Sequence, residues 1–252
     1  MPLPGAYPHI ITRKPSHDGQ DNLGMGYTAH GEQFLLKEGG PLGAAEFVGA
    51  GLCEACGIPA CLPTVVTIER LGVHEYIFGS RLDLGLHAFD QRNIAQWQRV
   101  MTVCSNPSAF SALLAIDLAL GNDDRHWNNW LAQNAVNALG ADCVRLRAMD
   151  FSRSWPVRHP AQHPLRHQSV NTWSAIKDWE MLGVCFDLRI FHATCAKIGS
   201  LNAHWLRSRV LQQLSGVFLT SAQIDHYCLW WSKHWRAQVI DAIDSLENGV
   251  WP

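Results

Sequence analysis

A short polar stretch, GNDDRHWNNWL at residues 121–131, lies between two apolar segments. It contains a carboxylate at Asp124 and an amide at Asn129, and a further carboxylate, Asp150, follows the run CVRLRAM. Mg²⁺ prefers hard oxygen ligands of these two kinds. A carboxylate outside the metal site can orient or deprotonate an attacking hydroxyl. The pattern therefore predicts phosphoryl transfer, with Asn129 and Asp150 as metal ligands and Asp124 as the base.

Phosphoryl transfer also needs a cation for the nucleotide phosphates, and Lys37 ends the apolar run FLLK. Glu46 falls in the first turns of a predicted helix, where it could pair with Lys37 and hold its ammonium in place. Glu38 and Glu54 are rival partners for the lysine. The alternative for each of these residues is a solvated surface charge, which is the commoner environment of lysine and glutamate.

The eight cysteines raise the alternative of a zinc or redox site. Cys53 and Cys56 form a CxxC pair with Cys61 nearby, and His192 with Cys195 could supply a second half-site. However, Cys53 and Cys56 fall inside a predicted helix, and the sequence holds no second CxxC pair. Packed thiols are therefore the favoured interpretation.

The first part of the chain is predicted to be rich in strands. A segment crowded with Gly, Asp and Asn, residues 16–31, is predicted to be a loop or hairpin turn. Strands are expected on both sides of it and again after a helix, where LPTVVTIERLGVHEYIFG is broken at Leu71 and Gly72. The expected elements are strands at 9–14 and 32–37, a helix at 41–57 and two strands within 62–79. A β-rich part with one main helix thus ends near residue 82.

The remainder is predicted to be mainly helical. Apolar periodicity predicts helices in IAQWQRVMTVC and SAFSALLAIDLALG, with Ser108 as the N-cap of the second and Gly121 as its stop. NWLAQN and CVRLRAMDF are typical of a β-hairpin because apolar and charged residues alternate in the second run. Further helices are predicted at 173–183, 187–198, 201–214 and 221–246. The fold class is therefore α+β.

Several motifs resemble those of a known family. DRHWNN resembles the D-R-H-x-x-N catalytic loop shared by phosphoinositide-type lipid kinases and HipA-like kinases, and MDF resembles the D-F-G metal-binding element. With Lys37, EFVGAGLCEACGIPACLPTV and EYIFGSRL, their order resembles the small, single-chain HipA-like kinases over roughly residues 10–155. The resemblance implies a two-lobed protein-kinase-like fold. Its β-rich N-lobe would span residues 1–82 and its mostly helical C-lobe residues 83–252.

The resemblance also implies individual roles. Asp124 would be the catalytic base, Asn129 and Asp150 the Mg²⁺ ligands, Lys37 the phosphate-holding lysine, and His126 a support for the loop backbone or for Asp150. All these residues match the family motif at the corresponding positions.

Other residues of the polar stretch are expected to hold the loop. Asn122 and Arg125 would orient it, and Trp127 and Trp130 would anchor it to the core. The motif assigns no chemistry to Asp123, so its replacement should be far milder than replacement of Asp124.

The sequence departs from the family pattern at two places. Ser152 replaces the glycine of D-F-G. The expected phosphate loop contains Gly24 and Gly26, with Gly19 and Gly31 at its ends, but has no G-x-G-x-x-G, so its assignment as nucleotide-binding rests on position alone. After Asp150, the Arg- and His-rich residues 153–170 are expected to form a solvated loop, with phosphate or substrate binding as the alternative.

Composition limits the class of protein. The chain has 252 residues, 47% hydrophobic and 17% charged, and a net charge of −2, so neither a disordered chain nor a broadly basic nucleic-acid surface is indicated. The N-terminal segment lacks a secretion-signal pattern, and no apolar run reaches the roughly 18 residues of a membrane span. A cytoplasmic protein is expected.

The prediction is an ATP- and Mg²⁺-dependent kinase. By family resemblance its acceptor would be a Ser or Thr hydroxyl of a protein, and an antitoxin-like partner is conceivable, although the chain shows no helix-turn-helix of its own. One alternative is a lipid or small-molecule kinase, disfavoured by the lack of an evident polybasic face. The other is a nucleotide-binding pseudokinase or interaction module.

Overall fold

The computed structural model describes residues 7–15, 22–83, 85–88, 93–158 and 171–247. Five antiparallel strands from the first part of the chain form one sheet, in the order β1-β2-β3-β5-β4. Their bounds are Ile10–Lys14 (β1), Asn22–Thr28 (β2), Gln33–Lys37 (β3), Leu62–Arg70 (β4) and Val73–Leu82 (β5). Burial alternates along β2, as in a strand with one buried face, whereas the central residues of β5 are buried on both faces.

The prediction of a loop at residues 16–31 is wrong for residues 22–28, which form β2 between β1 and β3. Glycine is depleted in strands, which is why the pattern suggested a turn. Here the missing side chain is needed: a Cβ on Gly26 would lie 2.8 Å from Leu36 Cδ1 and 3.0 Å from Ile10 Cγ2. Gly24, with φ of 101°, occupies an irregular point of the pairing with β3. Residues 16–21 lie outside the described residues.

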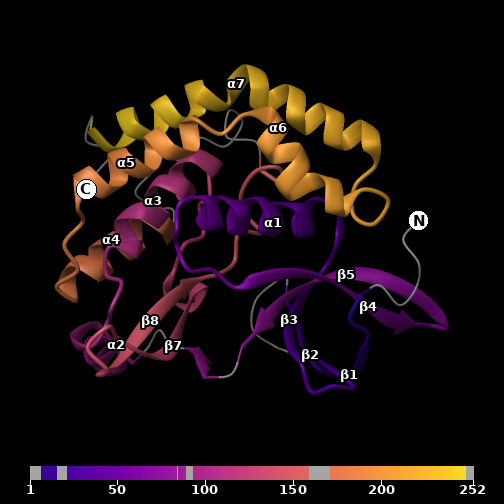
Figure 1. The fold of residues 1–252 in the computed structure, drawn as a ribbon, viewed down its shortest axis with the longest axis horizontal. Helices are drawn as coiled ribbons and strands as arrows, with labels where there is room; N and C mark the ends of the chain where they lie inside the picture. Colours follow the sequence, from indigo (N-terminus) through magenta and orange to yellow (C-terminus); the bar gives the residue numbers. More distant parts are fainter. Residues whose placement is uncertain (1–6, 16–21, 84, 89–92, 159–170, 248–252) are drawn as a thin grey trace.

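Helix α1, Gly40–Ala55, joins this sheet to the helical part of the molecule. It contacts β4 and β5 as well as α3, α5 and the turn η2, and Figure 1 shows it lying between the strands and helices α6 and α7. Three of its glycines make the close approach possible, because side chains from other elements occupy the space of a Cβ. These pairs are Gly43 with Phe218, Gly49 with Phe151, and Gly51 with Val210.

Helix α3, Ala109–Leu120, forms the centre of the core, and all of its residues are buried. Ser108 precedes the helix as expected but makes no side-chain cap hydrogen bond. Gly121 ends the helix with φ of 66°, as predicted from the sequence, because glycine adopts this left-handed conformation without steric cost. The polar stretch therefore begins directly at the end of the most buried helix.

A second sheet follows, with strands in the order β6-β7-β8. It contains Leu86–Ala88 (β6), Trp130–Val136 (β7) and Asp142–Ala148 (β8), which confirms the predicted hairpin and adds a third strand. The surrounding helices are α2 (Ile94–Thr102), α4 (Asn171–Met181), α5 (Leu188–Gly199) and α7 (Ser221–Glu247). The mixed α+β class predicted from the sequence is confirmed.

The single helix predicted at 201–214 is replaced by three short turns: α6 (Ala203–Trp205), the π-helical η2 (Leu206–Leu211) and η3 (Gln212–Leu214). Leu206 and Leu211 are both completely buried. A π-helical turn puts residues i and i+5 on the same face, which a regular α-helix does not. The wider turn thus lets both leucines face the core.

The largest hydrophobic cluster includes residues of α1, α3, α5 and α7, so it joins elements on both sides of residue 82. A smaller cluster lies within the first sheet. The division into domains at residue 82 stays a prediction. Among the described residues, no helix has both the length and the apolar character needed to cross a bilayer.

Candidate active site

Lys37, the last residue of β3, is buried between two carboxylates. Its Nζ lies 2.6 Å from Glu46 Oε1 and 2.6 Å from Asp150 Oδ1. Burial alone would lower the pKa of the ammonium, but the two carboxylates raise it above its usual value. Lys37 is therefore held as a cation at the point where β3, α1 and the end of β8 meet.

Glu46 is the partner of Lys37 among the three glutamates considered from the sequence. It is 4% exposed, and its second oxygen, Oε2, accepts a hydrogen bond of 3.0 Å from the Phe151 amide. Glu38 instead pairs with Arg70 at the surface, and Glu54 is exposed. One carboxylate thus connects α1, Lys37 and the Asp-Phe element.

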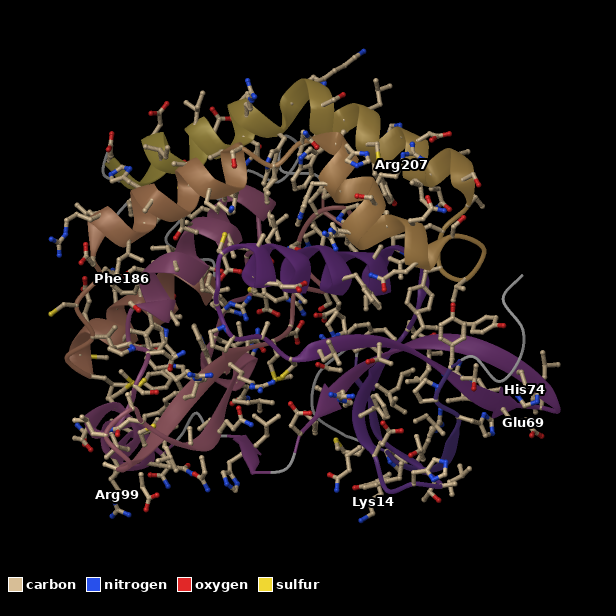
Figure 2. All side chains as sticks on the ribbon, viewed as in Figure 1. Lys14, Glu69, His74, Arg99, Phe186 and Arg207 are labelled. Carbon is tan, nitrogen blue, oxygen red and sulfur yellow. The ribbon has the colours of Figure 1, made fainter. Side chains whose placement is uncertain are left out.

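Most charged side chains of a protein lie at its surface, as Lys14 and Arg99 do at the periphery of the molecule in Figure 2. Removing a charge from water is costly unless it is paired and hydrogen-bonded. Lys37 and Glu46, 3% and 5% exposed in their side chains, meet that condition.

Asp150 follows β8 in a left-handed conformation, with φ of 63°, which is uncommon for a residue other than glycine. Such conformations concentrate at functional sites. Ser152, which replaces the glycine of D-F-G, donates its hydroxyl to Asp150 Oδ1 at 2.7 Å. Burial alone would raise the pKa of Asp150, but Lys37 and the Ser152 hydroxyl lower it to about 2. The carboxylate is thus ionised at neutral pH.

Phe151 holds the Asp-Phe element against α1. Its side chain is 1% exposed, and its ring occupies the space that a side chain on Gly49 would need. The Arg125 guanidinium lies 4.7 Å from the centroid of the same ring. The sequence analysis did not identify Gly49, although a glycine inside a helix is a signal of close packing.

Arg125 orients the polar stretch, as expected from the sequence. It pairs with Asp117 through Nε–Oδ2 at 2.8 Å and Nη2–Oδ1 at 3.0 Å, and it donates to the carbonyl oxygens of Asn129 and Met149. Burial alone would lower the pKa of this guanidinium, but the Asp117 carboxylate raises it. One buried cation therefore joins α3, the loop and the end of β8.

Asp117 is a structural residue that the sequence analysis missed. It is 0% exposed and accepts a 2.7 Å hydrogen bond from Asn122 Nδ2 in addition to the bonds from Arg125. The available signal was a single acid inside the otherwise apolar helix sequence AFSALLAIDLAL, since such a residue is rarely fully buried unless it is paired.

Asn129 directly precedes β7, as the last residue of the 3₁₀ turn Trp127–Asn129, and lies beside the strand end that carries Asp150. Its backbone carbonyl accepts from the Met149 amide at 3.1 Å, and its side-chain Nδ2 donates to the Asp124 carbonyl at 2.5 Å. That bond commits the amide nitrogen, so the oxygen Oδ1 is the atom suited to a metal. An amide oxygen and an ionised carboxylate fit the preference of Mg²⁺ for hard oxygen ligands.

Asp124 is held by two residues from later in the chain. Asn171 Nδ2 donates to Oδ1 at 2.5 Å, and Arg153 Nε lies 3.2 Å from Oδ2. Asn171 was not predicted from the sequence, and Arg153 was expected only to belong to a basic, solvated segment. Asp123 pairs instead with Arg158. The two adjacent acids therefore bind two different arginines of the segment that follows Asp150.

His126 supports the backbone of the loop, one of its two expected roles. Its Nδ1 accepts from the Asn128 amide at 3.2 Å, as the cap of a short 3₁₀ turn, Trp127–Asn129. Burial lowers the pKa of this imidazole, which favours the neutral form able to accept that bond. Trp127 and Trp130 are buried and anchor the loop as predicted, and Trp127 Nε1 donates to Asp178 at 2.7 Å.

Not every expected site residue reaches this cluster. Gly24 and Gly26 lie within β2, so their predicted part in phosphate binding stays a prediction. Of the basic segment 153–170, residues 159–170 lie outside the described residues.

The cysteines are free thiols, and no group of three or more His, Cys, Asp or Glu suited to a metal occurs among the described residues.

Comparison with known proteins gives matches to solved structures only. No protein-family model and no curated protein matches the chain. The Helicobacter pylori proinflammatory kinase CtkA aligns with a TM-score of 0.47 and 11% identity, over 96% of this chain and 97% of that one. HipA from a Shewanella oneidensis toxin–antitoxin complex with HipB and operator DNA aligns with a TM-score of 0.47 and 12% identity, over 98% of this chain and 74% of that one.

Proposed function

We propose that this protein is an ATP- and Mg²⁺-dependent kinase that transfers the γ-phosphoryl group of ATP to a hydroxyl, by resemblance a Ser or Thr hydroxyl of a protein. One observation carries the proposal: Lys37 is buried between Glu46 and Asp150, while the polar stretch lies next to the same strand end. Phosphoryl transfer requires this combination of cation, metal ligands and base, because its catalysis consists mainly of positioning and charge stabilisation.

Lys37 would hold the nucleotide phosphates. Its ammonium stays protonated because two carboxylates raise its pKa, and Glu46 keeps it in place through a bond of 2.6 Å. Asp150 and Asn129 would hold Mg²⁺, which when bound neutralises charge on the phosphate oxygens.

Asp124 would take the proton of the acceptor hydroxyl as that oxygen attacks the γ-phosphorus. The hydrogen bond from Asn129 to the Asp124 carbonyl couples the position of the base to that of the metal ligand. Arg125 and Asp117 keep the loop in register with Asp150 but would not contact the substrate.

The proposed function can be tested with γ-labelled ATP and Mg²⁺, comparing the wild type with Asp124→Asn and Asp150→Asn. We expect label transfer by the wild type and a loss of roughly 10²-fold or more in Asp124→Asn, the usual contribution of a general base. Asp123→Asn is the matched control, since it alters the neighbouring acid, which pairs with Arg158 rather than with the site. Equal losses at positions 123 and 124 would contradict the assignment of the base.

The acceptor class is tested in the same assay by supplying the protein alone, a protein extract or phosphoinositide vesicles. Labelling of the chain itself or of extract proteins supports a protein kinase, and labelling confined to the vesicles supports the lipid-kinase alternative. Absence of transfer in every sample, while ATP still raises the melting temperature, would show a nucleotide-binding module without turnover.

A further inference from the structure

Arg153 makes a contact that the roles above do not explain. Its Nε lies 3.2 Å from Oδ2 of Asp124, the proposed base. A base that must accept a proton from an incoming hydroxyl thus has a guanidinium on one of its oxygens. This contact requires either that Arg153 leave during the reaction or that it share the reacting space with the substrate.

The three arginines around the polar stretch differ in exposure and in their partners. The Arg125 side chain is 4% exposed and is bound by Asp117 and by two carbonyl oxygens. The Arg158 side chain is 35% exposed and pairs with Asp123. The Arg153 side chain is 32% exposed and pairs with the proposed base. Arg153 therefore combines contact with Asp124 and partial exposure to solvent.

The reaction places the phosphoryl group close to this guanidinium. The acceptor oxygen forms a bond to the γ-phosphorus, the bond from that phosphorus to the β,γ-bridging oxygen breaks, ADP leaves, and the hydroxyl proton goes to Asp124. The attacking oxygen thus lies between the base and the phosphorus, within hydrogen-bond reach of the base. A change of rotamer would then bring a group that touches Asp124 Oδ2 to the oxygens of the transferred phosphoryl group.

We propose that Arg153 is a further catalytic residue, which rests on Asp124 in the absence of nucleotide and moves to the transferring phosphoryl group when ATP and acceptor are bound. The inference depends on the proposed kinase function. Charge in the transition state spreads over the equatorial phosphoryl oxygens, and an arginine at that position supplies a planar set of donors. The same movement releases Asp124 to take the proton only when phosphate is present.

The experiment compares Arg153→Gln and Arg153→Lys with Arg158→Gln, measuring kcat and the KM for ATP separately, together with the melting temperature. Arg158→Gln is the matched control, because it removes a similarly exposed guanidinium from the same segment. For Arg153→Gln we expect kcat to fall about 100-fold or more, with the KM for ATP changed less than about threefold, because the interaction is made chiefly in the transition state. Arg153→Lys should recover only part of the loss, because an ammonium lacks the planar fork.

A second measurement separates chemistry from structure. In Arg153→Ala, added guanidinium ion should restore part of kcat, whereas a role confined to packing would not respond to it. If kcat of Arg153→Gln equals or exceeds that of the wild type, the inference is overturned. It is also overturned if the loss of kcat in Arg153→Gln comes with a lower melting temperature and Arg158→Gln loses kcat to the same extent. Absence of transfer in the wild type would instead overturn the proposed function itself, and the inference with it.

Discussion

Replacing Gly49 by alanine should destabilise the protein, although the same change stabilises an ordinary helix. A Cβ at this position would lie 2.1 Å from Cγ and 2.4 Å from Cδ1 of Phe151. Carbon atoms pack at about 3.5–4.0 Å, so the ring would have to move by more than about 1 Å. Such a movement would also disturb the contact with the Arg125 guanidinium, which lies 4.7 Å from the ring centroid.

The expected change in the free energy of unfolding is the sum of two opposing effects. Alanine favours a helix interior over glycine by about 1 kcal/mol. Overpacking a core costs typically about 1–3 kcal/mol and occasionally more. Because the contact here is far below van der Waals distance and the Phe151 ring is 1% exposed, the upper part of that range applies. We expect a net loss of about 2 kcal/mol in the free energy of unfolding.

The assay is urea denaturation of the wild type, Gly49→Ala and Gly199→Ala. Gly199 ends α5, and a Cβ there would meet nothing closer than Val239 at 3.6 Å, so the control should be neutral or slightly more stable. Equal stability of the two variants would refute the close packing of α1 on Phe151. Gly49→Ala should also lower phosphoryl transfer under conditions where it is folded, because Phe151 would carry its bond with Glu46 out of position.

Two further predictions concern the buried charges. Asp117→Asn should lower the free energy of unfolding by about 3–5 kcal/mol, because it leaves the Arg125 cation buried without its charged partner. The double variant Asp117→Leu with Arg125→Met should lose less unfolding free energy than this single variant. A larger loss in the double variant, measured by denaturation, would contradict this account. Lys37 depresses the pKa of Asp150 to about 2, so this carboxylate contributes stability that is present above the ordinary aspartate pKa and is lost as the pH falls through the folded value. The difference in unfolding free energy between wild type and Asp150→Asn should therefore shrink by about 2 kcal/mol between roughly pH 5 and pH 2, and a pH-independent difference would show that the ion pair does not stabilise the fold.

The elements with a strong local signal were predicted from the sequence. Helix α1 and the β4–β5 hairpin have clear periodicity and clear stops, and they form close to the expected residues. Strand β2 was missed, because the four glycines, two aspartates and one asparagine of residues 16–31 resemble a turn. Only the contact of Gly26 with Leu36 and Ile10 shows why a residue without a side chain is needed there.

By itself, the sequence determined which chemistry was available. The order and spacing of Lys37, Asp124, Asn129 and Asp150 are local properties of a linear chain, and they indicate phosphoryl transfer. The tertiary structure alone decided which residues are partners. It selects Glu46 over its two rivals, because only that carboxylate is buried against Lys37 and Phe151.

The structure also revealed residues for which the sequence offered little or no signal. Asp117 pairs with Arg125 across the loop, and Asn171 and Arg153 hold Asp124. These contacts join residues separated by up to 47 positions. Local periodicity in the sequence indicates which face of an element is apolar. The pairing of buried charges depends instead on how the elements pack against one another, and this packing is defined only in the folded chain.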